Sequence, residues 1–369
     1  MALIKLNNRS SEDNAIHGKR NLIINGAMQV VQRGTVSGLT GSSYGGPDRF
    51  KIGLSGAGTH RILQSATVPS GSGFANSWRL DCTTADTSIT SSDNLHCQYR
   101  IEGQDLQQLK KGTSSAEKVT LSFWVRSSLT GTYVLEVRDV DNSRHIAKTY
   151  TISQADTFEH KILTFDGDTT GVLDDDNARS LQIQWWLAAG PTYTTGTLPT
   201  SWASQVSANR AVGHNVNFAS STDNNWYLTG VQLEVGDTAT PFERRSYGED
   251  LALCSRYYHT SFSGETTIGG SHPASYSGKV FSWCDHYGSS PDRVAFNYQW
   301  PVQMRDIPTV TMYGNQWTSA RMSKYNGGSS EYTIDYASGI SRNGLGGYYD
   351  VAGTNGDFVV AYVEASAEL

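Results

Sequence analysis

The feature that most constrains the fold of this chain is an apolar–polar alternation with a period of two residues. In residues 118–126, Val119, Leu121, Phe123 and Val125 fall on one face of an extended segment. Successive side chains of a β-strand point to opposite faces, so this pattern predicts strands with one buried face. Similar alternation occurs in residues 49–54, 60–65, 77–82, 94–101, 133–140, 158–165, 181–188 and 226–235.

The segments between these candidate strands are rich in glycine, serine and proline, which favour turns. Charged residues are 17% of the chain and there are 37 glycines, whereas an ordinary soluble domain is about 25% charged. Short strands behind turns predict an all-β chain and disfavour a parallel sheet with crossover helices. We therefore expect a jelly-roll β-sandwich over residues 21–245.

One segment near residue 250 has helical character. Ser246 can cap a helix, Glu249 completes a capping box, and Leu251 and Cys254 follow at helical spacing. This pattern predicts a linker helix within residues 246–260. Candidate strands resume after it, and they predict a smaller C-terminal sandwich over residues 261–369.

The N-terminal residues have a different character. Residues 1–20 are rich in charges and amides, so they are either a docking tail or a disordered leader. The apolar stretch at 21–34, with Gly26 inside, predicts two short strands or a bulge. Residues 105–112 predict about two helical turns that stop at Gly112.

Several classes of protein are disfavoured by composition. No run approaches the roughly 20 apolar residues of a membrane span, and residues 1–20 lack the apolar core of a secretory signal. The net charge of −6 offers no basic footprint, so we expect no nucleic-acid partner. Cys82 and Cys97 lie on neighbouring candidate strands and could form a disulfide, although buried reduced thiols are the favoured interpretation.

No catalytic motif is present, and carboxylate pairs such as Glu102 with Asp105 or Glu234 with Glu243 are more simply explained as strand-end acids. We therefore expect no enzyme and no cofactor, with one alternative. Asp174, Asp175 and Asp176 are adjacent oxygen ligands that could hold a structural calcium ion. A solvated hairpin tip is the favoured interpretation of this run.

Aromatic residues in polar loops are the candidates for ligand contact, because Trp and Tyr offer flat apolar faces to sugars. Trp185 and Trp186 are adjacent in one strand, so one faces outward unless both faces are covered. Trp202 lies near Tyr193 in a polar loop, either as a glycan platform or folded inward against its own or a neighbouring chain. Further glycan-binding candidates, predicted in Gly/Ser-rich loops of the second domain, are Trp317, Tyr325, Tyr348 and Tyr349.

Three stretches resemble virion-surface and tail-fibre proteins of tailed bacteriophages. They are residues 21–34 with the PDRF of 47–50, residues 227–258, and the C-terminal segment from 300–313 to 362–369. Residues 98–126 also resemble a carbohydrate-binding-module jelly roll. The resemblance implies an all-β structural protein of the virion, usually a homotrimer, that contacts host-surface glycans. It supplies no catalytic residue, because the shared motif is structural.

The resulting hypothesis is a non-enzymatic tail-fibre or spike protein assembled in the host cytoplasm. Residues 1–20 dock onto other virion proteins, and the C-terminal domain recognises a host surface polysaccharide. The alternatives are a capsid decoration or cement protein, a virion-borne polysaccharide-degrading enzyme, and a secreted lectin.

Overall fold

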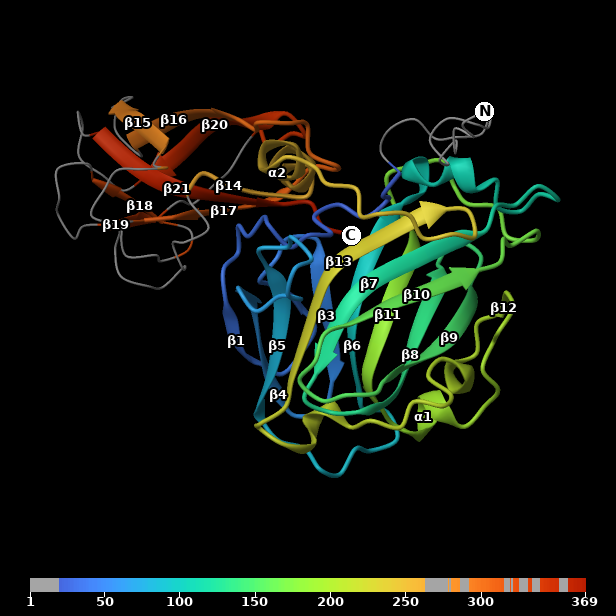
Figure 1. Cartoon of the computed structure of the whole chain (residues 1–369). Coiled ribbons are helices and arrows are strands. Elements are labelled where there is room, and N and C mark those ends of the chain that lie inside the picture. The colour runs from blue at the N-terminus through green and yellow to red at the C-terminus, as the bar shows by residue number, and fades with distance from the viewer. Residues whose placement is uncertain are drawn as a thin grey trace, which may run out of the picture.

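The computed structural model describes residues 20–262, 278, 280–285, 292–314, 319, 321–324, 331–333, 339–351 and 358–369. The described chain is dominated by β-strands, as the alternation predicted. Two facing sheets make up the larger lobe, and a third sheet lies in a smaller C-terminal lobe (Figure 1). Among the described residues, no helix is long and apolar enough to cross a membrane.

The larger lobe has jelly-roll connectivity. Its first sheet has the order β1 (Val36–Leu39), β4 (Thr59–Ser65), β5 (Ser77–Thr84), β13 (Asn225–Val235), β7 (Val119–Ser127), β10 (Glu159–Phe165). Its second sheet has the order β12 (Ala203–Ser204), β9 (Arg144–Ile152), β8 (Gly131–Asp139), β11 (Arg179–Ala189), β6 (Asn94–Glu102), β3 (Phe50–Ser55), β2 (Ser43–Tyr44). The chain passes repeatedly between two four-stranded sets, β5-β13-β7-β10 and β9-β8-β11-β6, which is the double Greek key of a jelly roll.

The core lies between these sheets. Phe123 of β7 meets Trp185 of β11 edge-on, with ring centroids 5.8 Å apart. Both rings are fully buried, and each such side chain contributes roughly 1.5–3 kcal/mol when removed from water. Cys82 and Cys97 lie in the two facing sheets as buried free thiols, which confirms the reduced state favoured from the sequence.

The N-terminal stretch departs from its prediction. Residues 21–34 contain no strand, so the expected two short strands are wrong; Asn25 and Met28 adopt positive φ angles of 59° and 58°, which interrupt extended backbone. The stretch instead runs beside β13, where Leu22 N–H donates to Leu233 O at 2.9 Å. Because residues 21–34 form no strand, the alternative of a bulge within them is wrong as well; the adjacent β13 has a register shift of its own between Thr229 and Gln232.

Short helical segments occur in the loops of the larger lobe. The helical turns expected over 105–112 are two short 3-10 turns, η1 (Gly103–Asp105) and η2 (Gln107–Leu109). The remaining short elements are α1 (Pro191–Thr194), η3 (Ser207–Asn209) and η4 (Phe218–Ser220).

Helix α2 (Tyr247–Ser255) begins where the sequence predicted, because the Ser246 hydroxyl accepts a hydrogen bond from the Glu249 N–H at 3.2 Å. The chain then enters the C-terminal lobe through β14. That lobe consists of β14 (Tyr258–Thr260), β15 (Val280–Asp285), β16 (Asp292–Gln299), β17 (Thr309–Tyr313), β18 (Arg321–Lys324), β19 (Glu331–Thr333), β20 (Gly344–Val351) and β21 (Phe358–Ser366). Strand β21 is central: its first half pairs with β15 and β18, and its second half with β14 and β17.

Buried ion pairs connect the two lobes at a region that we call the junction, formed by Arg49, Glu102, Arg256, Tyr257 and Glu368. The Arg49 guanidinium bonds the Glu368 carboxylate at 2.5 Å and lies 3.3 Å from the centre of the Tyr257 ring. Arg256 bonds Glu102 at 2.7 Å. The chain end therefore returns to the jelly roll, as Figure 1 shows at the label C.

Candidate functional site

A cavity lies in the C-terminal lobe, and we call it the amide pocket after Asn297, Gln299, Gln303, Ser341 and Asn343. Its volume is about 510 Å³. Trp300, Pro301, Val302, Leu345 and three glycines complete its lining. The pocket therefore combines an apolar part with several convergent amide and hydroxyl groups, as ligand pockets commonly do.

The pocket forms where β16 ends and β20 begins. Asn297 and Gln299 of β16 pair with Gly346 and Gly344 of β20 in antiparallel register. A Cβ added at Gly346 would meet nothing within 4 Å, so this glycine leaves open space opposite Asn297. The sequence alternation thus places two amides on one side of β16 while the partner strand contributes no bulk.

Hydrogen bonds fix the loop that closes the pocket. The Trp300 N–H donates to Asn343 O at 3.1 Å, and its indole Nε1 donates to Ser341 O at 3.0 Å. Gln303 Nε2 donates to Asn343 Oδ1 at 3.2 Å. By contrast, the Asn297 and Gln299 side chains are exposed and make no hydrogen bond within the described part of the chain. These two amides are therefore available to a ligand.

The electrostatics of the amide pocket suit a neutral polar ligand. None of the described lining residues carries an acidic, basic or imidazole side chain. The ring of His259 stacks on Tyr298, which lies between Asn297 and Gln299 in β16, and burial lowers the pKa of His259 to about 4. The arrangement can hold hydroxyl and amide groups by hydrogen bonding, but the lining offers no general acid or base.

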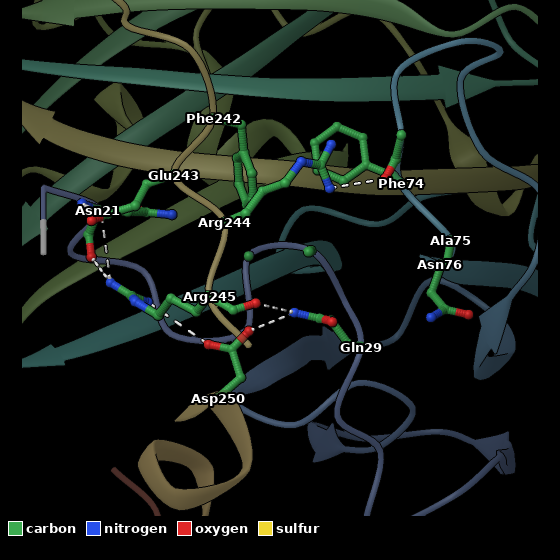
Figure 2. Close-up of a pocket in the computed structure, with 13 residues that line it drawn as sticks. Asn21, Gln29, Phe74, Ala75, Asn76, Phe242, Glu243, Arg244, Arg245 and Asp250 are labelled. Atoms are coloured by element: carbon green, nitrogen blue, oxygen red, sulfur yellow. Dashed lines mark hydrogen bonds and ion pairs between the residues drawn. The ribbon is translucent and has the colours of Figure 1, made fainter. Parts of the chain in front are cut away.

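A smaller cavity of about 120 Å³ lies beside the N-terminal stretch (Figure 2). Arg244 donates to Gly73 O and Ser72 O and lies 4.8 Å from the centre of the Phe74 ring. Arg245 points the other way in Figure 2, toward the backbone of Asn21 and the Asp250 carboxylate, to which Gln29 also donates.

These contacts bind three distant segments together. The three segments are residues 21–34, residues 227–258 and the loop before β5. The first two are stretches that carry the sequence resemblance to phage virion proteins. The cavity therefore belongs to the packing of the jelly roll, consistent with a motif that serves structure.

The predicted aromatic platform of the larger lobe is engaged in packing. Trp202 is half-buried, its Nε1 donates to Asp166 O at 2.7 Å, and the Lys111 ammonium lies 4.5 Å from its ring centre. Tyr193 lies 5.2 Å from Trp186, and the two belong to one cluster on the outer side of the second sheet. Trp185 and Trp186 are both fully buried, so both faces of β11 are covered at this point.

The glycan-binding candidates predicted in loops of the C-terminal lobe lie partly in a strand and partly outside the described residues. Tyr348 and Tyr349 lie in strand β20 and not in a loop, because residues 344–351 pair continuously with β16. Trp317 and Tyr325 lie outside the described residues. Sequence reasoning missed the amide pocket; the available signal was the run of Asn and Gln at alternate positions just before Pro301.

The acidic residues singled out from the sequence serve the fold or face solvent. Glu102 is fully buried and forms an ion pair with Arg256. Glu234 accepts a hydrogen bond from the N–H of Thr240, and Glu243 accepts one from the N–H of Asn21. Asp105 is exposed. Asp174, Asp175 and Asp176 are exposed on a loop. Within the described ranges no three His, Cys, Asp or Glu side chains gather as they would around a metal ion.

Known proteins resemble this chain only at low sequence identity. No protein-family model and no curated protein matches the sequence. Solved structures with some similarity include an enzymatically active domain of tailspike protein 4 from bacteriophage CBA120, at 13% identity and a TM-score of 0.29 over 58% of this chain. The chain covers 21% of that tailspike.

Two smaller proteins are similar at the same level. One is a putative sugar-binding protein from Bacteroides thetaiotaomicron, with 10% identity over 58% of this chain and 99% of that one, and a TM-score of 0.30. The other is the family 11 carbohydrate-binding module from Clostridium thermocellum, with 10% identity over 56% and 99%, and a TM-score of 0.28. Scores in this range establish neither a shared family nor a shared function.

Proposed function

We propose that this chain is a non-enzymatic surface protein of a tailed-phage virion that binds a host cell-surface glycan in the amide pocket. The observation that carries the glycan part is the lining of that pocket: unpaired amides beside a tryptophan in about 510 Å³. Ligand pockets commonly measure roughly 300–1,000 Å³, so the space suits a short saccharide.

The chemistry of the lining favours a sugar over other small ligands. A sugar hydroxyl both donates and accepts, and an Asn or Gln amide offers both functions on one rigid group. Asn297 and Gln299 are exposed and unpaired within the described chain, so binding does not require breaking an internal hydrogen bond. The lack of charge in the lining favours a neutral sugar unit.

The virion part of the proposal is supported by the sequence resemblance. In this proposal residues 1–20 dock onto other virion proteins, and the chain assembles as a homotrimer. Several weak sites on one particle then act together, and avidity can raise apparent affinity by about 10²–10⁴. The buried ion pairs of the junction support the same role, because they hold the binding lobe at a fixed orientation on the jelly roll.

The test is a glycan array probed with the full chain and with the double variant Asn297→Ala/Gln299→Ala. We expect the wild type to select a small set of saccharides and the variant to lose at least tenfold in affinity. Gln154→Ala removes an exposed amide from the jelly roll and is the matched control. Equal binding by all three proteins, or no binding by the wild type, would contradict the proposed site.

Two further measurements address the competing functions. Release of reducing ends from a host polysaccharide by the purified protein would make it an enzyme, and we expect none. Labelling of the chain in images of whole particles separates a tail fibre or spike from a capsid cement protein.

A further inference from the structure

A second site lies on the jelly-roll lobe, on the outer side of its second sheet, and it is independent of the amide pocket. We call it the arginine face, formed by Lys51, Arg100, Arg138, Arg179 and Arg210. Gln182 of β11 is paired with Arg100 of β6 on one side and with Arg138 of β8 on the other. These three side chains therefore form one row across three strands and point away from the core.

Neighbouring positions extend this row into a surface. Lys51 of β3 pairs with Gln98 of β6, which pairs with Gln184 of β11. Arg179 is brought to the same side by an irregularity in β11 between Arg179 and Leu181, and its Nη1 donates to Gln182 Oε1 at 3.2 Å. A bulge commonly redirects a side chain in this way.

Each guanidinium is oriented by a glutamine oxygen, which is a neutral acceptor. Arg100 donates to Gln98 at 3.1 Å, Arg210 to Gln184 at 2.7 Å, and Arg138 to Gln205 through two nitrogens at 3.1 and 2.7 Å. Gln98, Gln182 and Gln184 are each less than 5% exposed and lie beneath the charged groups. The glutamines thus hold the arginines in place without neutralising them.

The positive charges are only partly compensated. Arg210 is paired with Glu136, and Arg100 bonds the main-chain oxygen of Leu369, the last residue. Glu136 also attracts Arg138, Glu368 attracts Lys51 and Asp141 attracts Arg179, but among the described residues no Asp or Glu side chain forms an ion pair with these three cations. Burial and the neighbouring Arg210 lower the pKa of Arg138 to about 10, and burial and Arg100 lower the pKa of Arg179 and Lys51.

Such an arrangement opposes folding, because like charges repel in a partly desolvated setting. All five cationic side chains are half-buried, so their charged ends remain within reach of a ligand. The chain as a whole carries a net charge of −6, whereas these five cations lie together on one face. Charge complementarity therefore favours an anionic occupant.

We propose that the arginine face binds an acidic polysaccharide through the carboxylates of its uronic acid units. The guanidinium fork matches a carboxylate in two parallel hydrogen bonds. The backbone positions of Arg100 and Arg138 are separated by one intervening strand, about 10 Å, so a polymer with repeated carboxylates meets both.

The test is titration calorimetry of the full chain with polygalacturonate, and with dextran as the neutral polymer. We expect binding to polygalacturonate only, weakening as salt is raised. Arg138→Gln and Arg179→Gln should each weaken the affinity about tenfold, because each removes a charged hydrogen-bond donor to the polymer, and the double variant should not bind measurably. Arg126→Gln is the matched control, because Arg126 lies on the other sheet and is already paired with Asp156.

Three outcomes would overturn the proposal. They are no binding of polygalacturonate by the wild type at low salt, equal binding by the double variant, and tighter binding of polyglutamate, which would point to an acidic protein segment. Asn297→Ala/Gln299→Ala should leave polygalacturonate binding unchanged, so the two sites are tested separately.

Discussion

The ion pairs of the junction allow us to predict how much free energy of unfolding is lost when one charged partner is removed. The Glu368 carboxylate bonds Arg49 at 2.5 Å and Arg33 at 3.1 Å. The Arg49 side chain is 1% exposed and that of Glu368 is 6% exposed. Glu368→Ala therefore leaves a buried guanidinium without its counter-charge. Removal of one partner of a buried pair costs about 3–5 kcal/mol, and we expect a loss of unfolding free energy in that range.

The assay is urea unfolding of the full chain, followed by tryptophan fluorescence, in a double-mutant cycle with Arg49→Met. Arg49→Met also removes the unpaired charge, so the double variant should be more stable than the sum of the two single losses implies. Asp156→Asn, which breaks the more exposed Arg126–Asp156 pair and keeps a residue that tolerates the positive φ of this position, is the control and should cost about 0–1 kcal/mol. A loss below 1 kcal/mol for Glu368→Ala would refute the reasoning.

Three further predictions concern stability. Burial raises the pKa of Asp48 from 3.8 to about 6, so the folded state holds this proton more tightly than the unfolded state. Stability should therefore fall by about 3 kcal/mol in total as the pH rises from about 3 to 7, and Asp48→Asn should flatten that part of a urea-midpoint profile. Arg138→Gln relieves repulsion on the arginine face and should raise the melting temperature at low salt, whereas an unchanged or lower value would count against the repulsion. Gly230 has a φ of +61°, and an added Cβ would lie 2.6 Å from the Phe74 ring. Gly230→Ala should therefore lower the free energy of unfolding, measured in urea, by about 1 kcal/mol or more. An unchanged free energy would be inconsistent with the geometry of the bulge.

Much of the fold follows from local pattern in the sequence. The alternation of Leu121, Phe123 and Val125 predicted a strand with one buried face, and all three are fully buried in β7. Ser246 predicted the start of α2 because its side chain replaces a missing backbone acceptor. In both places the determinants lie within a few residues of each other.

The failures have a different physical origin. Residues 21–34 are apolar enough for a strand, but Asn25 and Met28 turn the backbone and the neighbouring β13 supplies the hydrogen bonds. Of the two alternatives for the aromatic loop, the sequence could not show that Trp202 contacts Lys111 and the Asp166 carbonyl oxygen within the fold. Propensity alone does not specify such tertiary partners.

The amide pocket and the arginine face could not be predicted from the sequence, for a related reason. Asn297 and Asn343 are distant in sequence and meet only because β16 pairs with β20. Arg100 and Arg138 share a face only because β11, which follows both in sequence, inserts between their strands. Sheet order is a property of the whole fold, so no local sequence pattern predicts the residues of the amide pocket or of the arginine face.

The most direct test of the account is the binding of host surface saccharide to the C-terminal lobe. A saccharide selected on the array should titrate into the full chain with a measurable heat and a 1:1 ratio to each chain. The account predicts that Asn297→Ala/Gln299→Ala abolishes this heat while the melting temperature stays within about 2 °C of the wild type. Undiminished heat in that variant would contradict the assignment of the amide pocket as the attachment site.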